Sequence, residues 1–146
     1  MELLEEITRK GIEPTVITYS AAISACEKAG QSSQADVVFS IARSNNLFNN
    51  VITYSKTNSF TVDLHDFLLD TAKAIIRYCY FKIMPANTKK YNTLIVITGK
   101  GNHINSDGCR GVLRKEIEIY LRNTLGIENV KPDPKNDGCL IISMVI

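Results

Sequence analysis

The stretch Thr93-Leu-Ile-Val-Ile-Thr-Gly-Lys-Gly101 (TLIVITGKG) decides the fold class. Its first six residues form a continuous run of strand-forming, mostly apolar residues, which is typical of a β-strand covered on both faces. Two glycines that flank a lysine follow at once, and glycine allows the backbone to turn sharply where a strand ends. The stretch therefore predicts a buried strand that leads into a tight loop.

The segments on both sides of this strand alternate between strand and helix patterns. We expect strands at 61–65 and 140–145, apolar helical stripes at 67–79 and 112–121, loops at 87–91 and 131–135, and a helix N-cap at Asp66. This order predicts an α+β two-layer domain of β-α-β-α-β-β type, preceded by an α-helical repeat fragment. We place the domain at residues 56–146 and the helical fragment at residues 1–55.

Asp63 and His65 form the first candidate site, in the stretch Thr61-Val-Asp-Leu-His65. Residues two apart on a strand face the same way, so both polar side chains project together near the strand end. A buried pair of this kind would be costly unless it were satisfied, so we expect it at a surface or cleft. The alternative is structural: the aspartate caps the next helix and the histidine packs at a sheet edge.

The loop Thr98-Gly99-Lys100-Gly101 forms the second candidate site. Glycines bring backbone N–H groups close to an anion, and a helix start adds a favourable dipole. Lys100, His103 and Arg110 can add positive charge, and Arg114 lies in the helix that follows. The pattern suits a phosphate, although it matches neither the Walker loop nor the full glycine fingerprint of dinucleotide-binding folds.

The first third of the chain predicts a helical repeat. The pentapeptide VITYS occurs at residues 16–20 and again 35 positions later, at 51–55. Apolar residues with helical spacing predict two antiparallel helices, at 18–29 and 33–44, with Gly30 ending the first and Ser32 or Ser33 capping the second. We interpret the second VITYS as the start of another repeat that a domain junction cuts short.

Composition and charge set limits on function. The 146 residues are 45% apolar and 22% charged, and no run of 18 or more apolar residues exists, so we expect no membrane partner. Residues 1–50 hold four Lys/Arg and six Asp/Glu, and residues 51–146 hold thirteen and nine, so the second part is mildly basic and suits a polyanion. The four cysteines are scattered without a C-x-x-C pair, which favours reduced structural thiols over zinc ligands.

The segment RKGIEPTVITYSAAISACEKAGQSSQADVVF resembles a pentatricopeptide repeat. The resemblance covers one full unit, residues 16–50, and the last 15 residues of a unit before it. In this family one repeat contacts one RNA base, and the resemblance implies that Ser20 and Asn50 choose the base, in a combination similar to the one that favours adenine. The alternative is that both are ordinary solvated turn residues.

Residues 60–146 resemble the SMR (small MutS-related) domain, through V-D-L-H, I-T-G-K-G-N-H and N-D-G-C-L-I-I. The whole chain is thus similar to the PPR-SMR family, which implies an RNA-binding protein of a plastid or mitochondrion. No targeting peptide is expected in the acidic start of this chain, which we interpret as the carboxy-terminal piece of a longer protein. The site residues implied are Asp63, His65, Thr98, Gly99, Lys100, Gly101 and His103.

Our functional hypothesis is phosphodiester hydrolysis in organellar RNA processing. His65 would act as general base or acid, and Asp63 would orient it or hold Mg²⁺, the candidate cofactor. Lys100 would stabilise developing charge on the phosphate. The alternatives are a non-catalytic module that binds RNA or a ribosome surface, and a DNA-nicking domain. We expect no small-molecule cofactor.

Overall fold

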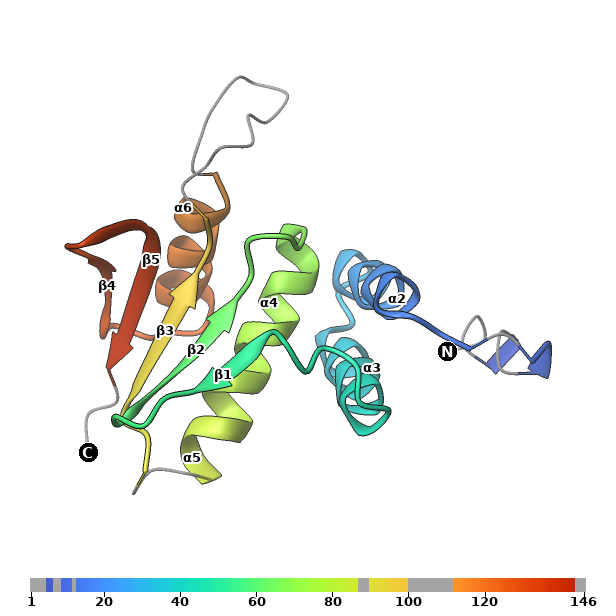
Figure 1. Cartoon of the computed structure of the whole chain (residues 1–146). Coiled ribbons are helices and arrows are strands. Elements are labelled where there is room, and N and C mark those ends of the chain that lie inside the picture. Colours follow the sequence, from blue (N-terminus) through green and yellow to red (C-terminus); the bar gives the residue numbers. More distant parts are fainter. Residues whose placement is uncertain (1–4, 7–8, 12, 87–89, 100–111, 144–146) are drawn as a thin grey trace.

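The computed structural model describes residues 5–6, 9–11, 13–86, 90–99 and 112–143 (Figure 1). The helices α2 (Val16–Lys28) and α3 (Ser32–Ser44) come first. The elements that follow are β1 (Ile52–Tyr54), β2 (Ser59–Asp63), α4 (Leu69–Tyr78), a π-helical segment (Cys79–Ile83), α5 (Met84–Ala86), β3 (Thr93–Ile97), α6 (Val112–Ile119), a second π-helical segment (Tyr120–Thr124), β4 (Val130–Asp133) and β5 (Asn136–Ser143).

The described residues form a five-stranded sheet in the order β1-β2-β3-β5-β4. β2 and β3 are parallel, with Asp63 opposite Ile97, and the other neighbouring strands are antiparallel. The crossover between the two parallel strands runs through α4, as a parallel pair requires. Because β2 and β3 are parallel, their carboxyl ends lie at the same end of the sheet. Both candidate motifs begin there.

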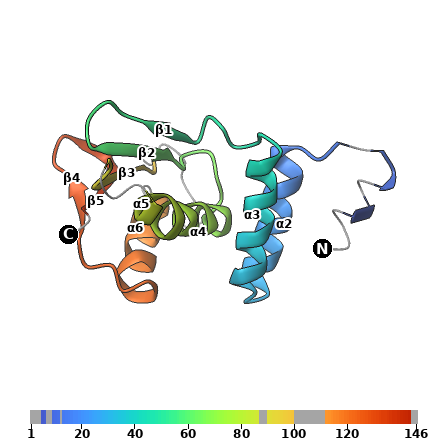
Figure 2. The same ribbon diagram turned by 90° about the horizontal axis from the view of Figure 1, so that it is seen from below.

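The helices α4 and α6 cover one face of the sheet, which gives two layers (Figure 2). Side chains that point toward the helices are fully buried, as Phe60, Val62, Leu94 and Val96 show. The predicted α+β two-layer class is therefore confirmed. The prediction that β3 is covered on both faces was wrong, because its second face carries the partly exposed Ile95 and Ile97 with no helix over them among the described residues.

The repeat helices α2 and α3 form as predicted, with bounds that differ by one or two residues. Thr15 caps α2 in a reciprocal hydrogen-bonding arrangement with Thr18, and Gly30 follows the helix with a φ of 74°. The predicted serine cap of α3 was wrong, because Ser32 already lies inside the helix and Gln31 precedes it without a side-chain cap bond.

Helix α4 packs beside the repeat, with its amino-terminal end against α2. The Thr71 hydroxyl donates to the Ser20 carbonyl at 3.2 Å, and the Ser24 hydroxyl donates to Asp70 at 3.3 Å. α2 and α4 run in the same direction, since Glu27, near the end of α2, meets Arg77, near the end of α4. α4 therefore packs against two parts of the chain: it covers the sheet, and it lies beside the repeat helices.

The second VITYS is a strand, although the same five residues are helical at 16–20. Ile52, Thr53 and Tyr54 pair with β2, opposite Val62, Thr61 and Phe60. β1, which precedes the predicted boundary after residue 55, is thus hydrogen-bonded into the sheet. The pairing has a physical reason: once residues 59–63 form β2, the short connection at 55–58 brings β1 alongside it as a hairpin.

Two further predictions were wrong in detail. Residues 131–133, predicted as a loop, belong to β4, where Pro132 is tolerated because β4 is an edge strand and one side of it needs no N–H donors. Asp66, predicted as a helix N-cap, lies before the cap position, which Leu68 occupies.

Within the described part of the chain, no helix is both long and apolar enough to cross a membrane.

Candidate functional site

Asp63 and His65 lie at the carboxyl end of β2, with Asp63 as the last residue of the strand. Asp63 Oδ1 accepts a hydrogen bond from the His65 backbone N–H at 3.1 Å. The same oxygen is hydrogen-bonded to His65 Nδ1. The carboxylate thus fixes both the backbone and the ring of the histidine, while the His65 side chain is 48% exposed. This arrangement can hold an imidazole in one orientation beside solvent, which general acid–base chemistry needs.

Gly99 brings the second motif against the first. Its φ is +86°, and a Cβ added to it would lie 3.2 Å from the Cβ of His65. The Leu64 N–H also donates to the Ile97 carbonyl at 2.7 Å, which extends the parallel pairing beyond the last residue of β2. The glycine is therefore required both by its backbone conformation and by the close approach of His65.

The side chain of Thr98 points inward, and its predicted contact with nucleic acid stays a prediction. Its side chain is buried, and its hydroxyl donates to the Gly138 carbonyl at 3.1 Å. The backbone N–H groups of Thr98 and Gly99 donate to the same carbonyl, at 2.7 and 3.2 Å. The sequence prediction missed this inward orientation, which follows from strand alternation because Thr98 lies on the same face as the buried Leu94 and Val96.

Asp66 completes the surroundings of His65. Its Oδ2 lies 3.1 Å from His65 Nε2, so both ring nitrogens face a carboxylate. The hydrogen bond with Asp63 raises the pKa of His65 above its ordinary value, and the negative charges of Asp63 and Asp66 act in the same direction, while desolvation by burial opposes them. The site therefore favours the imidazolium form, and Nε2 becomes free only when the exposed Asp66 side chain moves away.

A titration of His65 tests this electrostatic picture. The chain has two histidines, so His103→Gln leaves His65 as the single histidine signal in an NMR titration. We expect a midpoint above 6.5, a clear decrease with Asp63→Asn, and a smaller decrease with Asp66→Asn. A midpoint at or below 6.5 would contradict the geometry.

The raised pKa of His65 also determines how this residue contributes to stability at different pH values. Because the folded pKa of His65 exceeds the unfolded value near 6.5, its contribution is fully present below about pH 6.5. It is lost as the pH rises through the folded pKa. Unfolding free energies measured across this range should therefore lose part of their pH dependence in the Asp63→Asn variant.

Substitution of Gly99 by alanine should disturb both motifs together. An L-residue at positive φ costs about 1–2 kcal/mol, and the added methyl group would also meet His65 at 3.2 Å. The matched control is Gly126→Ala, because Gly126 has a φ of +69° and nothing within 4 Å of an added Cβ. We expect a larger loss of unfolding free energy for Gly99→Ala in urea denaturation. Equal losses would indicate that His65 adapts freely.

Of the remaining residues predicted to bind phosphate, the structure describes only Arg114. Lys100, Gly101, His103 and Arg110 lie outside the described residues. Arg114 is partly exposed in the first turn of α6, which begins where the described part of the chain resumes after residue 99. The phosphate-binding roles of these residues stay predictions from the sequence.

The two predicted base-reading residues have different surroundings. Asn50 is exposed in the turn before β1. The Ser20 Oγ is buried with no hydrogen-bond partner among the described residues, and α4 packs against the same turn of α2 through the bond from Thr71. Ser20 is partly buried beside α4, and its base-reading role stays a prediction.

Among the described residues, no group of three or more His, Cys, Asp or Glu side chains is placed to hold a metal ion. Asp63, the predicted Mg²⁺ ligand, uses Oδ1 for two hydrogen bonds to His65. Mg²⁺ takes six oxygen ligands and is commonly bound through one or two carboxylates together with water and substrate phosphates, so the Mg²⁺ role of Asp63 stays a prediction. The steps proposed below are written for the residues of this chain alone.

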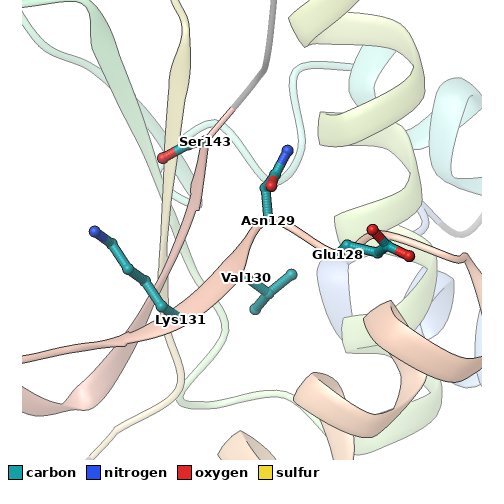
Figure 3. A pocket seen from close by; sticks show the side chains of 5 residues that line it. All are labelled: Glu128, Asn129, Val130, Lys131 and Ser143. Carbon is teal, nitrogen blue, oxygen red and sulfur yellow. The ribbon is translucent and has the colours of Figure 1, made fainter.

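A shallow pocket of about 280 Å³ lies elsewhere, along β4 (Figure 3). Its lining residues are Glu128, Asn129, Val130, Lys131 and Ser143. They come from β4, which lies at the opposite edge of the sheet from β1, from the two residues before it, and from the end of β5. The pocket is thus separate from the site at the ends of β2 and β3.

Two residues near the site were missed by the sequence prediction. Gly138 supplies the carbonyl that anchors Thr98 and Gly99. It precedes the strand predicted at 140–145 but lies inside the observed β5, where a glycine allows another backbone to approach closely. Cys139 pairs with Ile97, which itself pairs with Asp63. Burial raises the pKa of the Cys139 thiol, and the charges of Asp133 and Asp63 add to this, so the thiol stays protonated and is a poor nucleophile.

Comparison with known families agrees with this geometry. The family model described as the Smr domain matches residues 62–144, which is more than half of the chain. The chain belongs to the Smr domain family. A model described as the pentatricopeptide repeat domain matches residues 2–57, so a repeat precedes the Smr domain, as the sequence predicted.

The solution structure of the B3BP Smr domain is similar to this chain, with 20% sequence identity and a TM-score of 0.42. The alignment covers 84% of this chain and 99% of that one. A search of curated proteins found no match. A repeat followed by an Smr domain makes this chain a nucleic-acid-binding protein.

Proposed function

We propose that the chain cleaves RNA phosphodiester bonds at the Asp63–His65 pair, as part of RNA processing in a plastid or mitochondrion. The observation that supports this proposal is the oriented His65 ring, which Asp63 holds at Nδ1, with Gly99 close to the His65 Cβ. Localisation rests only on the resemblance to the PPR-SMR family. The catalytic hypothesis rests on the geometry of three residues at the ends of two parallel strands.

In the proposed reaction His65 accepts or donates a proton at Nε2. Asp63 keeps its hydrogen bond to Nδ1, so proton exchange is confined to the other nitrogen. As a general base, His65 would remove a proton from the attacking hydroxyl, and the conjugate acid would then protonate the leaving oxygen. The raised pKa of His65 favours the acid form, so protonation of the leaving group is the step for which the resting site is prepared.

A second candidate function has an observation in its favour. Asp66 lies 3.1 Å from Nε2, the nitrogen that the reaction needs, and adds negative charge where a phosphate would approach. A site whose proton-transfer atom is already occupied suits a module that binds RNA without cleaving it. This alternative predicts binding that weakens with salt and forms no products.

A cleavage assay on the purified chain separates these functions. Labelled single-stranded RNA, structured RNA and supercoiled DNA are incubated with the protein in Mg²⁺ or in EDTA. Cleavage of RNA in preference to DNA supports the proposal, and the EDTA arm tests the predicted Mg²⁺ requirement. Cleavage of supercoiled DNA alone would favour the DNA-nicking alternative.

The matched control is the His65→Ala protein, purified in the same way. Products that persist in this control at the wild-type rate come from a contaminating nuclease. Binding of RNA without products in the wild-type protein would contradict the catalytic proposal and favour the binding module. A filter-binding measurement on the same samples distinguishes the absence of binding from the absence of cleavage.

A further inference from the structure

A second surface with the chemistry of a nucleic-acid contact lies at the free edge of β1. Tyr54 is 48% exposed although it belongs to a strand of the sheet. Its ring stacks on Phe60, with centroids 6.0 Å apart and planes 29° apart, and lies 5.3 Å from the ring of Tyr91. Tyr54 thus contacts two neighbouring rings, and among the described residues β1 has no strand on its outer side.

Positive side chains lie over aromatic rings close to Tyr54. Lys90 lies 5.4 Å from the centroid of Tyr91, and the Arg43 guanidinium lies 5.7 Å from that of Tyr78. Burial raises the pKa of Tyr54 while the charge of Arg43 opposes the shift, which places Arg43 within electrostatic reach of the Tyr54 hydroxyl.

The hairpin between β1 and β2 adds a third cation. Lys56 is exposed in this turn. The turn is tied to the segment after Lys90 and Tyr91, because the Asn58 carbonyl accepts from the Asn92 N–H at 2.8 Å. We call Arg43, Tyr54, Lys56, Lys90 and Tyr91 the Tyr54 patch.

The sequence around the patch is free of acidic residues. No Asp or Glu occurs from residue 37 to residue 62, or from residue 71 to residue 106. Both stretches contribute residues to the patch. A half-exposed aromatic ring among cations, without acidic residues close in sequence, is complementary to a base and its flanking phosphates.

We propose that the Tyr54 patch binds single-stranded RNA, with a base stacked on Tyr54 and phosphates paired with Arg43, Lys56 and Lys90. The inference rests on the nucleic-acid binding of the proposed function, but it uses different residues from the Asp63–His65 site. Tyr54 is opposite Phe60, three residues before Asp63, so the two positions are separated by about 10 Å along the strand.

The patch joins the two parts of the chain. Arg43 belongs to α3 of the repeat, while Tyr54 and Lys90 belong to the sheet and the segment before β3. RNA bound here would contact the repeat and the Smr domain at once. The patch thus gives the chain a separate contact for an unpaired base, on the opposite face of the sheet from Asp63.

The absence of tryptophan from the sequence makes a direct test possible. Tyr54→Trp introduces a single tryptophan into the patch, and Ile119→Trp introduces one into α6, where the native side chain is 43% exposed and Glu116 and Glu118 are close in sequence. Each variant of the full chain is titrated with an oligoadenylate of about twelve nucleotides. We expect tryptophan quenching only in Tyr54→Trp, with the same midpoint as the anisotropy of the labelled oligonucleotide.

Affinity measurements on further variants complete the test. Tyr54→Ala should weaken binding roughly five- to hundredfold, as loss of one stacked base does, whereas Tyr54→Phe should bind like wild type. Lys56→Gln and Lys90→Gln should each lower the salt dependence of log K by about 0.7. Lys56 and Lys90 are exposed, so their replacement should not disturb the core. The two lysine variants therefore still test the proposal if Tyr54→Ala does not fold.

Three results would overturn the proposal. They are wild-type protein that does not bind oligoadenylate, a Tyr54→Trp signal that stays constant while anisotropy reports binding, and tighter binding of oligodeoxyadenylate than of oligoadenylate. Failure of the proposed cleavage is a separate outcome. In that case RNA would still quench Tyr54→Trp, and no products would form.

Discussion

Replacement of Arg77 by methionine is expected to lower the free energy of unfolding by about 3–5 kcal/mol. Arg77 lies on α4 with only 9% of its side chain exposed, and it forms an ion pair with Glu27 of α2, which is 7% exposed. It also donates to Asp36 of α3, at 3.0 Å from Nε and 2.8 Å from the terminal nitrogen. Its other terminal nitrogen donates to the Tyr120 hydroxyl at 2.9 Å.

The expected cost comes mainly from Glu27. Removal of one partner of a buried pair leaves the other charge in a medium of low dielectric, which costs more than the pair itself contributes. Asp36 is 44% exposed, so water can replace the guanidinium there. Arg77 is also the residue that joins both repeat helices to the Smr domain, so its loss should loosen the repeat as well as lower stability.

Urea denaturation and thermal melting measure this effect, and the melting temperature should fall by roughly 10 °C. The double variant Arg77→Met with Glu27→Leu removes both charges and should recover most of the loss. Lys10→Met is the matched control, because Lys10 pairs with Glu6 at 3.1 Å on an exposed surface. It should change stability by less than about 0.5 kcal/mol. A similar small change for Arg77→Met would mean that the buried network does not hold the repeat in place.

The sequence predicted the parts of the fold that have local patterns. The helices α2, α3, α4 and α6 and the strands β2, β3 and β5 follow from apolar periodicity over each segment. β1 and β4 could not be found this way, because each is short and lies at a sheet edge. Their strand conformation depends on hydrogen bonds to a neighbouring strand, and a short edge segment carries little pattern of its own.

The two VITYS segments show why local sequence was insufficient. Tyr19 is buried in α2, while Tyr54 is half exposed in β1. The helix at 16–28 continues an apolar stripe over several turns, whereas the second copy is followed by polar residues and by β2. Five residues set a preference, and the surrounding chain decides between helix and strand.

The candidate site was predictable to a similar degree. The positions of Asp63, His65 and Gly99 at strand ends followed from the sequence, and parallel pairing of β2 and β3 brings them together. The inward orientation of Thr98 and the approach of Asp66 to His65 depend on tertiary geometry. The link through Arg77 was also unpredicted, since its partners are 41 to 50 residues away along the chain.

Loss of the His65 side chain should reduce RNA cleavage by a factor on the order of 10²–10⁴, the usual contribution of general acid–base catalysis. His65→Ala should leave the fold intact, because the side chain is half exposed and its bonds within the described part of the chain are to the neighbouring Asp63 and Asp66. RNA affinity should stay close to the wild-type value, since the contacts of the Tyr54 patch are unchanged. Single-turnover cleavage and anisotropy on the same samples measure the two quantities.

Asp63→Asn separates positioning from catalysis. An asparagine keeps the acceptor for the His65 N–H but removes the charge that raises the pKa of the ring. If His65 acts as base, activity needs the neutral ring, so the rising part of the pH–rate profile should move to lower pH in this variant. If His65 acts as acid, the falling part should move to lower pH instead. A lower cleavage rate with an unchanged pH–rate profile would indicate that Asp63 has only a structural role.

Asp66→Asn provides the complementary case. It removes a carboxylate from Nε2 while the bond between Asp63 and Nδ1 remains. If the chain is a nuclease whose proton-transfer atom is partly blocked, this variant should cleave RNA faster than wild type at neutral pH. If the chain only binds RNA, Asp66→Asn should bind more tightly, because a negative charge near the phosphate is gone, and should still form no products. The pair of results therefore decides whether the Asp63–His65 geometry serves catalysis or recognition.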